Sequence, residues 1–295
     1  MKDQTYSHVI VVGIDGVGSF IKDADTPAFD RIFSDGAVTF GALASYPSGS
    51  AECWGSMLLG VGPEIHQLNF EKVNGNPYPS DSTFPSLFRR IREAMPGAEL
   101  GSYCDWSPIT RGMVENDVGV SAESAHDTEL APRICDYIRD KRPTFLFVQF
   151  DSIDAKGHHN GYGSPAHLKR ASEVDSLLGD VYDAVVDAGI AEDTLFIAVS
   201  DHGGTNPGDG TGSHGGWSKP EKRTTLALRG KTVKKGAIAA ANVRDSAAIV
   251  LYALGVDVPS FDENGWTSQV PAGIFDDDVP AYKDITHITD KTEWK

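Results

Sequence analysis

His8-Val-Ile-Val-Val-Gly-Ile14, followed directly by Asp15, is the stretch of sequence that decides the fold. The run is apolar and rich in β-branched residues, which is typical of a strand buried on both faces of a sheet. The same pattern, an apolar run that leads into an acid, returns at residues 144–150 and 194–199. Strands of this kind are typical of parallel sheets that helices cover on both sides.

Helical patterns alternate with these strands, so we predict a three-layer α/β/α fold with a mostly parallel central sheet. No repeat or low-complexity linker divides the chain, and we expect one domain over residues 1–295. Residues 61–81 and the glycine-rich residues 200–222 are predicted to be loops, and the acidic tail after Phe275 an edge or mobile element. Weaker strands are expected at 98–103 and 225–228, and helices at 27–34, 51–59, 84–95, 129–139, 165–188 and 244–254.

The bulk composition limits the function classes. With 40% hydrophobic and 23% charged residues the chain is an ordinary globular protein, and its formal net charge is −16. That charge argues against a nucleic acid polymer or an anionic membrane as partner, but not against a small anionic substrate. No apolar stretch approaches the ~18 residues of a membrane span. We expect a cytoplasmic protein, because the three cysteines lack CxxC spacing and the start of the sequence lacks a signal-peptide pattern. A homo-oligomer is possible on this sequence.

Acids and histidines gather after the predicted strands, where the carboxyl ends of parallel strands meet at one edge. A lone acid there is usually a turn or capping residue, and we interpret Asp151 in that way. The whole group instead favours a metal site, because carboxylate oxygen and imidazole nitrogen suit zinc, with manganese or iron as alternatives. Its members are Asp15, Asp154, His158, Asp201, His202 and His214.

Local spacing predicts how two of these pairs lie. Asp154 and His158 are four residues apart, but Gly157 between them leads us to expect a tight loop rather than a helical turn. Asp201 and His202 are adjacent, so their side chains diverge unless the backbone turns sharply. They therefore serve one ion across a turn or lie between two ions.

Ser50 is the candidate nucleophile. It lies in Tyr46-Pro-Ser-Gly-Ser-Ala-Glu-Cys-Trp54, just before an apolar helical pattern. In isolation, a hydroxyl at a helix start is more often an N-cap. The same place also suits phosphoryl transfer, because free backbone N–H groups favour an anion there and a bound cation would activate the hydroxyl.

In this order, the segments resemble the alkaline phosphatase superfamily, particularly its nucleotide pyrophosphatase/phosphodiesterase-like branch. The resemblance runs over roughly residues 8–270 and implies an alkaline phosphatase-like fold. Its matching stretches are Asp15, Pro47–Gly60 with Ser50 in the nucleophile position, Pro63–His66, Asp154–His158, Asp201–Gly203 and His214-Gly215.

The resemblance implies a phosphoric ester hydrolase that uses two divalent cations and a phosphoseryl intermediate on Ser50. One cation would be held by Asp15, Ser50, Asp201 and His202, and the other by Asp154, His158 and His214. The Ala51 N–H and the side chain of Asn69 would contact the substrate, a small phosphate ester.

Two residues depart from the family pattern: Glu52 and Cys53 stand where the family has Pro and Asn. A phosphomonoesterase or phosphonate hydrolase of the same superfamily is the main alternative. A phosphomutase is disfavoured because only about 100 residues separate Ser50 from Asp154, which leaves little room for its cap domain. A sulfatase is disfavoured because the sequence lacks the Cys/Ser-x-Pro-x-Arg motif of that class. A non-catalytic metal-binding module is disfavoured because it would not need all six metal ligands together with a nucleophilic hydroxyl.

Overall fold

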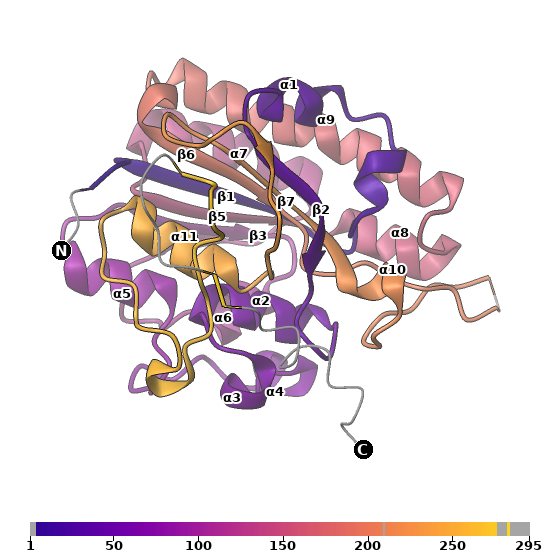
Figure 1. The fold of residues 1–295 in the computed structure, drawn as a ribbon, viewed down its shortest axis with the longest axis horizontal. Coiled ribbons are helices and arrows are strands. Elements are labelled where there is room, and N and C mark those ends of the chain that lie inside the picture. The colour runs from indigo at the N-terminus through magenta and orange to yellow at the C-terminus, as the bar shows by residue number, and fades with distance from the viewer. Residues whose placement is uncertain (1–3, 209, 276–281, 284–295) are drawn as a thin grey trace.

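A central sheet lies between two layers of helices in the computed structural model, which describes residues 4–208, 210–275 and 282–283 (Figure 1). Its order is β4-β3-β5-β1-β6-β7-β2-β8. β1 pairs in parallel with β5 and β6, whereas β7 runs antiparallel to β6 and β2. The predicted three-layer fold with a mostly parallel sheet is confirmed. The strands are β1 (His8–Ile14), β2 (Ala37–Leu43), β3 (Leu100–Cys104), β4 (Ser121–Glu123), β5 (Phe145–Phe150), β6 (Thr194–Val199), β7 (Arg223–Arg229) and β8 (Gly236–Ala237).

Each face of the sheet carries its own hydrophobic core. One core packs against α1 (Pro27–Phe33), α7 (Asp127–Lys141), α8 (Ser152–Asn160) and α9 (Pro165–Asp187). The other packs against α2 (Ser50–Leu59), α5 (Leu87–Ala94), α6 (Pro108–Gly112) and α11 (Asp245–Ala253). Short helices complete the described chain: α3 (Pro63–His66), α4 (Phe70–Gly75), α10 (Lys219–Lys222), η1 (Phe20–Asp23), η2 (Ala191–Asp193) and η3 (Glu263–Gly265).

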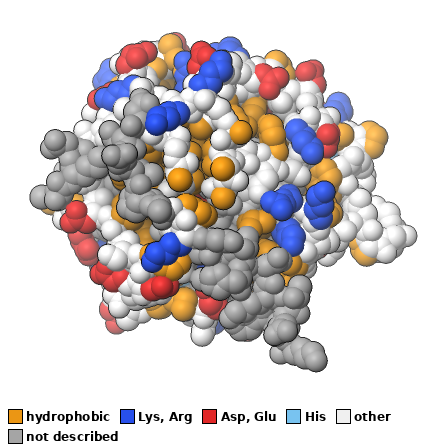
Figure 2. Space-filling model, viewed as in Figure 1, with side chains coloured by type: hydrophobic (Ala, Val, Ile, Leu, Met, Phe, Trp, Pro, Cys, Tyr) orange, Lys and Arg blue, Asp and Glu red, His pale blue; other side chains and the backbone are white. Residues whose placement is uncertain are grey.

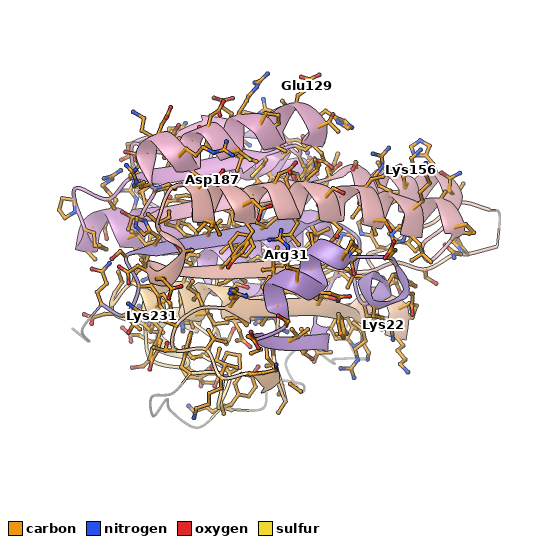
Figure 3. All side chains as sticks on the ribbon, turned by 90° about the horizontal axis from the view of Figure 1, so that it is seen from above. Lys22, Arg31, Glu129, Lys156, Asp187 and Lys231 are labelled. Carbon is orange, nitrogen blue, oxygen red and sulfur yellow. The ribbon has the colours of Figure 1, made fainter. Side chains whose placement is uncertain are left out.

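The outer surfaces of these layers are charged. In Figure 3 the exposed Glu129 of α7 and Asp187 of α9 lie on the solvent side of their helices. Figure 2 shows the face that is turned to the viewer in Figure 1. Acidic and basic side chains lie on this face as well, and apolar side chains are exposed near its middle. Within the described residues, no helix is both long and apolar enough to cross a membrane.

Several element predictions were wrong in detail. β2 was missed because it is only half-buried and lacks a continuous apolar run, and β4 and β8 are too short to give a pattern. The predicted loop at 61–81 contains α3 and α4, and the loop at 200–222 ends in α10. Most of the tail after Phe275 lies outside the described residues, and the single domain over 1–295 stays a prediction.

Candidate active site

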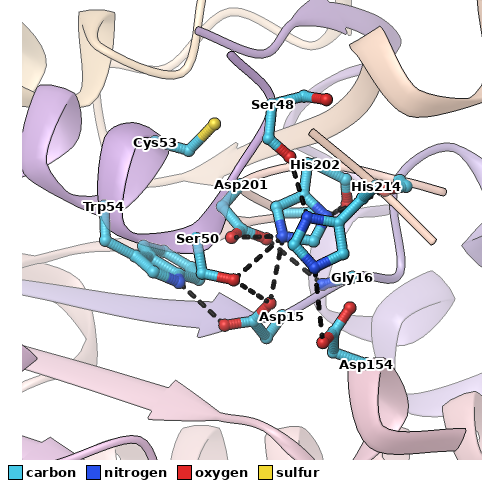
Figure 4. A network of polar contacts seen from close by, with 12 residues as sticks. Asp15, Gly16, Ser48, Ser50, Cys53, Trp54, Asp154, Asp201, His202 and His214 are labelled. Carbon is cyan, nitrogen blue, oxygen red and sulfur yellow. Dashed lines mark hydrogen bonds and ion pairs between the residues drawn. The ribbon is translucent and has the colours of Figure 1, made fainter. Parts of the chain in front are cut away.

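Three neighbouring strands deliver the candidate residues to one edge of the sheet (Figure 4). Asp15 follows β1, Asp201 and His202 follow β6, and β5 leads into α8, which carries the 154 and 158 side chains. The register places the ends of these strands level, since Ile14 pairs with Phe150. Ser50 reaches the same place from the first turn of α2, and the loop before α10 supplies the 214 imidazole.

The first group of side chains surrounds the hydroxyl of Ser50. Its Oγ lies 3.4 Å from Oδ1 of Asp15 and 3.0 Å from Nε2 of His202. The same nitrogen is 3.2 Å from Oδ2 of Asp201. Asp15, Asp201 and His202 are fully buried and offer ligand atoms within 4.8 Å of one another, a spacing that one cation can bridge.

The second group lies beside the first. Nε2 of His158 is 3.1 Å from Oδ2 of Asp154 and 3.1 Å from Nε2 of His214. The ring of His214 stacks on that of His202 at 3.8 Å between centroids, so the two groups touch. The His158 side chain is 42% exposed, and the site is therefore open to solvent on this side.

The expected tight loop at Asp154–His158 was wrong, because these residues lie one turn apart on α8. The helix is started by Asp127, whose carboxylate accepts hydrogen bonds from the backbone N–H groups of Asp151 and Ser152 at 2.9 and 3.1 Å. Asp151 occupies the N-cap position, but its own side chain makes no cap and accepts a bond from Gln149.

All three histidines of the site are oriented in the same way. Nδ1 of His158, His202 and His214 lies 3.1, 2.8 and 3.0 Å from the backbone carbonyls of Gly212, Gly203 and Ser48. A carbonyl only accepts, so Nδ1 of each ring carries a proton and Nε2 faces inward, with a lone pair in the neutral ring and an N–H in the protonated ring. Two such lone pairs 3.1 Å apart repel unless a proton or a cation lies between them.

Burial and mutual repulsion shift the acids strongly. Burial, and then the charges of Asp201 and Asp154, raise the pKa of Asp15 well above its usual value. Burial and Asp154 raise the pKa of Asp201 to about 7. Burial opposes ionisation of Asp154 too, but the hydrogen bond from His158 and nearby imidazoles bring its pKa below the usual value. Burial and His202 lower the pKa of His214 to about 4.

These residues fit divalent cations. Oδ2 of Asp201 is buried and, within the described part of the chain, has no hydrogen-bond donor. Three carboxylates crowded beside inward-facing imidazole nitrogens offer a set of lone pairs that a divalent cation would complement. Oxygen and nitrogen ligands in this mixture suit zinc, manganese or iron. The roles of the individual ligands stay predictions.

Sequence reasoning missed the side chains that orient these acids. Nε1 of Trp54 and Nε2 of Gln149 each donate to Oδ2 of Asp15 at 2.8 Å, and the hydroxyl of Tyr162 donates to Oδ1 of Asp154 at 2.6 Å. Trp54 follows Ser50 by one helical turn, and Gln149 is a polar residue in an apolar strand. Both signals were available, whereas nothing local indicates Tyr162.

The predicted substrate contacts remain untested. The N–H of Ala51 lies in the first turn of α2, where an α-helix offers its amides no acceptor. Asn69 is exposed, and its Oδ1 accepts from the N–H of Lys72 at 2.9 Å, which makes it the N-cap of α4.

The structure shows where the two residues that depart from the family pattern, Glu52 and Cys53, lie. The carboxylate of Glu52 folds back over Gly49, where a β-carbon would collide with it, and burial raises its pKa. Cys53 is a fully buried, free helix residue whose thiol pKa burial raises well above its usual value. His66 is half-buried, and its Nδ1 accepts from the N–H of Leu68 at 2.9 Å.

Residues 88–252, more than half of the chain, match the Type I phosphodiesterase/nucleotide pyrophosphatase family. The chain belongs to this family. The match includes all candidate residues from Asp154 onward but not Asp15 or Ser50. The resemblance to the alkaline phosphatase superfamily and its phosphodiesterase branch is thereby confirmed.

Two relatives and one solved structure extend the comparison. The GPI ethanolamine phosphate transferase 3 of Eremothecium gossypii is 33% identical over 129 residues, 39% of this chain and 12% of that protein. The GPI ethanolamine phosphate transferase 2 of Aspergillus oryzae is 28% identical over 132 residues, 42% of this chain and 15% of that protein. The match thus spans only 12% and 15% of the length of these two relatives. Murine ectonucleotide pyrophosphatase/phosphodiesterase 5 shares the fold, with a TM-score of 0.72 at 15% identity over 86% of this chain and 97% of that chain.

Proposed function

We propose that this protein is a two-cation phosphoric ester hydrolase of the phosphodiesterase/nucleotide pyrophosphatase type, with Ser50 as its nucleophile. One observation carries the proposal: the Ser50 hydroxyl lies at the start of α2, between a carboxylate of Asp15 and the inward-facing Nε2 of His202. Such a hydroxyl meets both needs of phosphoryl transfer, a means of losing its proton and a helix N-terminus that accepts an anion.

Two groups of residues would hold the cations, as the geometry of the site supports. Asp15, Ser50, Asp201 and His202 would hold one, and Asp154, His158 and His214 the other. Divalent ions, zinc by preference with manganese or iron as alternatives, would supply Lewis acidity and neutralise phosphoryl oxygens. The three acids would offset most of that positive charge, so an anionic substrate meets a nearly neutral site despite the net charge of −16.

The reaction would proceed through Ser50 in two displacements. Its oxygen forms a bond to phosphorus as the bond to the leaving alcohol breaks, and the serine proton leaves with that alcohol. The free amides of the first turn of α2, including that of Ala51, receive a phosphoryl oxygen. Water then attacks the phosphoserine, releases the phosphate ester and returns a proton to Ser50.

A transferase is the second candidate, because both curated relatives are named as ethanolamine phosphate transferases. The same phosphoseryl intermediate would pass its phosphoryl group to an alcohol instead of water. Supplying ethanolamine or another small alcohol during turnover of a diester separates the two functions. A hydrolase yields a monoester at an unchanged rate, whereas a transferase yields a new diester in proportion to the alcohol.

The substrate class needs its own comparison. The nucleophile segment from residue 46 to 54 holds no arginine to bind the extra charge of a monoester, which favours a diester or phosphonate monoester. Rates with bis-p-nitrophenyl phosphate, p-nitrophenyl phosphate and a nucleotide pyrophosphate should rank the first or third above the second. We also propose that the substrate is a small molecule and that the protein works in the cytoplasm.

Ser50→Ala tests the nucleophile. We expect turnover to fall by roughly 10³-fold or more, since the residual rate would come from the remaining site alone, while the bound cations stay. Ser56→Ala is the matched control, because Ser56 lies on the same helix and donates only to the carbonyl of Glu52 at 2.8 Å and faces His66. Turnover by Ser50→Ala at the rate of Ser56→Ala would refute the assignment.

A further inference from the structure

Tyr162 is a buried tyrosine that lies against the second group of site residues. Its exposure is 3%, and its hydroxyl donates to Oδ1 of Asp154 at 2.6 Å. That bond occupies one carboxylate oxygen and leaves the other, Oδ2, facing His158 at 3.1 Å and His214 at 3.9 Å. The phenol therefore determines which oxygen of Asp154 faces the imidazoles.

The surroundings of Tyr162 are built to hold its ring in place. Gly157 lies on α8, and Gly204 and Gly212 lie in the loop before α10; a β-carbon on any of the three would collide with the ring. The backbone is held as well, because Asn206 accepts from the N–H of Tyr162 at 2.8 Å and donates to its carbonyl at 2.9 Å. A ring enclosed in this way has one position, and so does its hydroxyl.

The first group of site residues is oriented by other side chains. Oδ2 of Asp15 takes its hydrogen bonds from Trp54 and Gln149, whereas the hydroxyl of Tyr162 donates to Asp154 (Figure 4 shows the Trp54 bond). Loss of the phenol hydroxyl should therefore disturb one group and leave the other intact.

We propose that Tyr162 is a positioning residue that orients Asp154 for one of two cations. Its hydroxyl would raise the affinity for this cation and leave the affinity for the other unchanged. The inference rests on the cation-binding part of the proposed function. Partners that orient a metal ligand in this way are worth about 10–100-fold in metal affinity.

The test is a titration of the protein with zinc alone, by calorimetry or competition with a chelating dye. The wild type should bind two ions. Tyr162→Phe should bind one of them as the wild type does and the other about 10–100-fold more weakly. Tyr137→Phe is the matched control, because the phenol of Tyr137 donates to Oε1 of Glu99 at 2.8 Å, away from the site.

A second variant acts from the outside of the ring. Gly157→Ala places a methyl group against the aromatic ring of Tyr162 and should weaken the same cation, whereas Gly75→Ala, with no atom within 4 Å of its new methyl group, should change nothing. If Tyr162→Phe bound both zinc ions as the wild type does, or bound both equally more weakly, the role of Tyr162 would be refuted and the proposed function would not. A wild-type protein that binds no zinc, manganese or iron would overturn the proposed function as well.

Discussion

Asp15 owes its orientation to two N–H donors on the same oxygen. Trp54 and Gln149 both donate to Oδ2, which leaves Oδ1 facing the hydroxyl of Ser50 at 3.4 Å. Trp54 lies one turn after Ser50 on α2, so two contacts on one face of the helix fasten it to the end of β1. The position of Ser50 thus depends on a fully buried indole.

Trp54→Phe removes the N–H and keeps an aromatic ring. We expect kcat/KM to fall about 10–100-fold, because Asp15 gains freedom to rotate, with a loss of about 1 kcal/mol in the free energy of unfolding. Steady-state kinetics and urea unfolding measure the two effects separately.

Trp266→Phe is the control for this change. Its indole is equally buried and donates to the carbonyl of Ser268 at 2.8 Å, outside the site. This variant should lose stability alone. If both variants kept full activity, Trp54 would be a packing residue and no more.

The residues that follow strands were predictable from sequence, and those that support them were not. Asp15 and Asp201 each follow a run that only a buried strand explains, so their common edge could be inferred. The contact between Tyr162 and Asp154 depends on how the loop after α8 folds back between glycines, which no local pattern records.

At the scale of elements, α8 shows why a propensity argument failed. Glycine costs about 1 kcal/mol in a helix interior, and on that ground Gly157 predicted a loop. The structure offsets this cost with the cap from Asp127, and glycine is required because the ring of Tyr162 packs against it. A tertiary requirement at the site therefore overrides the local preference.

Helix α1 is joined to α9 by a buried carboxylate. Thr26, the N-cap residue of α1, makes no side-chain cap. Asp175 of α9 accepts instead from the N–H groups of Ala28 and Phe29, both at 2.8 Å. A residue from another helix thus does the work of the missing cap, and the two helices cover the sheet as a unit.

Asp175→Asn should lower the free energy of unfolding by about 1–2 kcal/mol, because the amide loses the charge and one acceptor oxygen. Asp183→Asn is matched to it, since Asp183 also lies on α9 and pairs with Arg31 of α1 at 2.9 Å, but its side chain is 54% exposed. That variant should cost less than about 1 kcal/mol. If urea unfolding showed a larger loss for Asp183→Asn than for Asp175→Asn, Asp175 would not act as the cap of α1.

At the scale of the whole molecule, charge and stability meet in the site. The chain carries a net charge of −16, and three of its acids lie together at the carboxyl edge of the sheet, two of them fully buried. Without cations, burial and mutual repulsion raise the pKa values of Asp15 and Asp201, so the fold favours their protonated forms. The candidate site therefore opposes folding when its acids ionise.

The pH dependence of cation binding follows from these directions. The pKa of Asp201 rises from 3.8 to about 7 on folding, so between these values the folded protein keeps a proton that the unfolded chain has lost. The free energy of unfolding of the cation-free protein must then fall as pH rises through this window, and Asp15 acts in the same direction.

Divalent cations displace those protons, so their apparent affinity should rise with pH over the same window, by about tenfold per unit for each proton displaced. His214, with a pKa of about 4, is already neutral there and does not compete. The rise in Tm on adding zinc or manganese, relative to protein treated with a chelator, should thus increase steadily from about pH 4 to about pH 7. Thermal unfolding at intervals across this range measures it, and Asp201→Asn should flatten the dependence. A gain in Tm that stayed constant or shrank with rising pH would mean that these buried acids do not bind the cation.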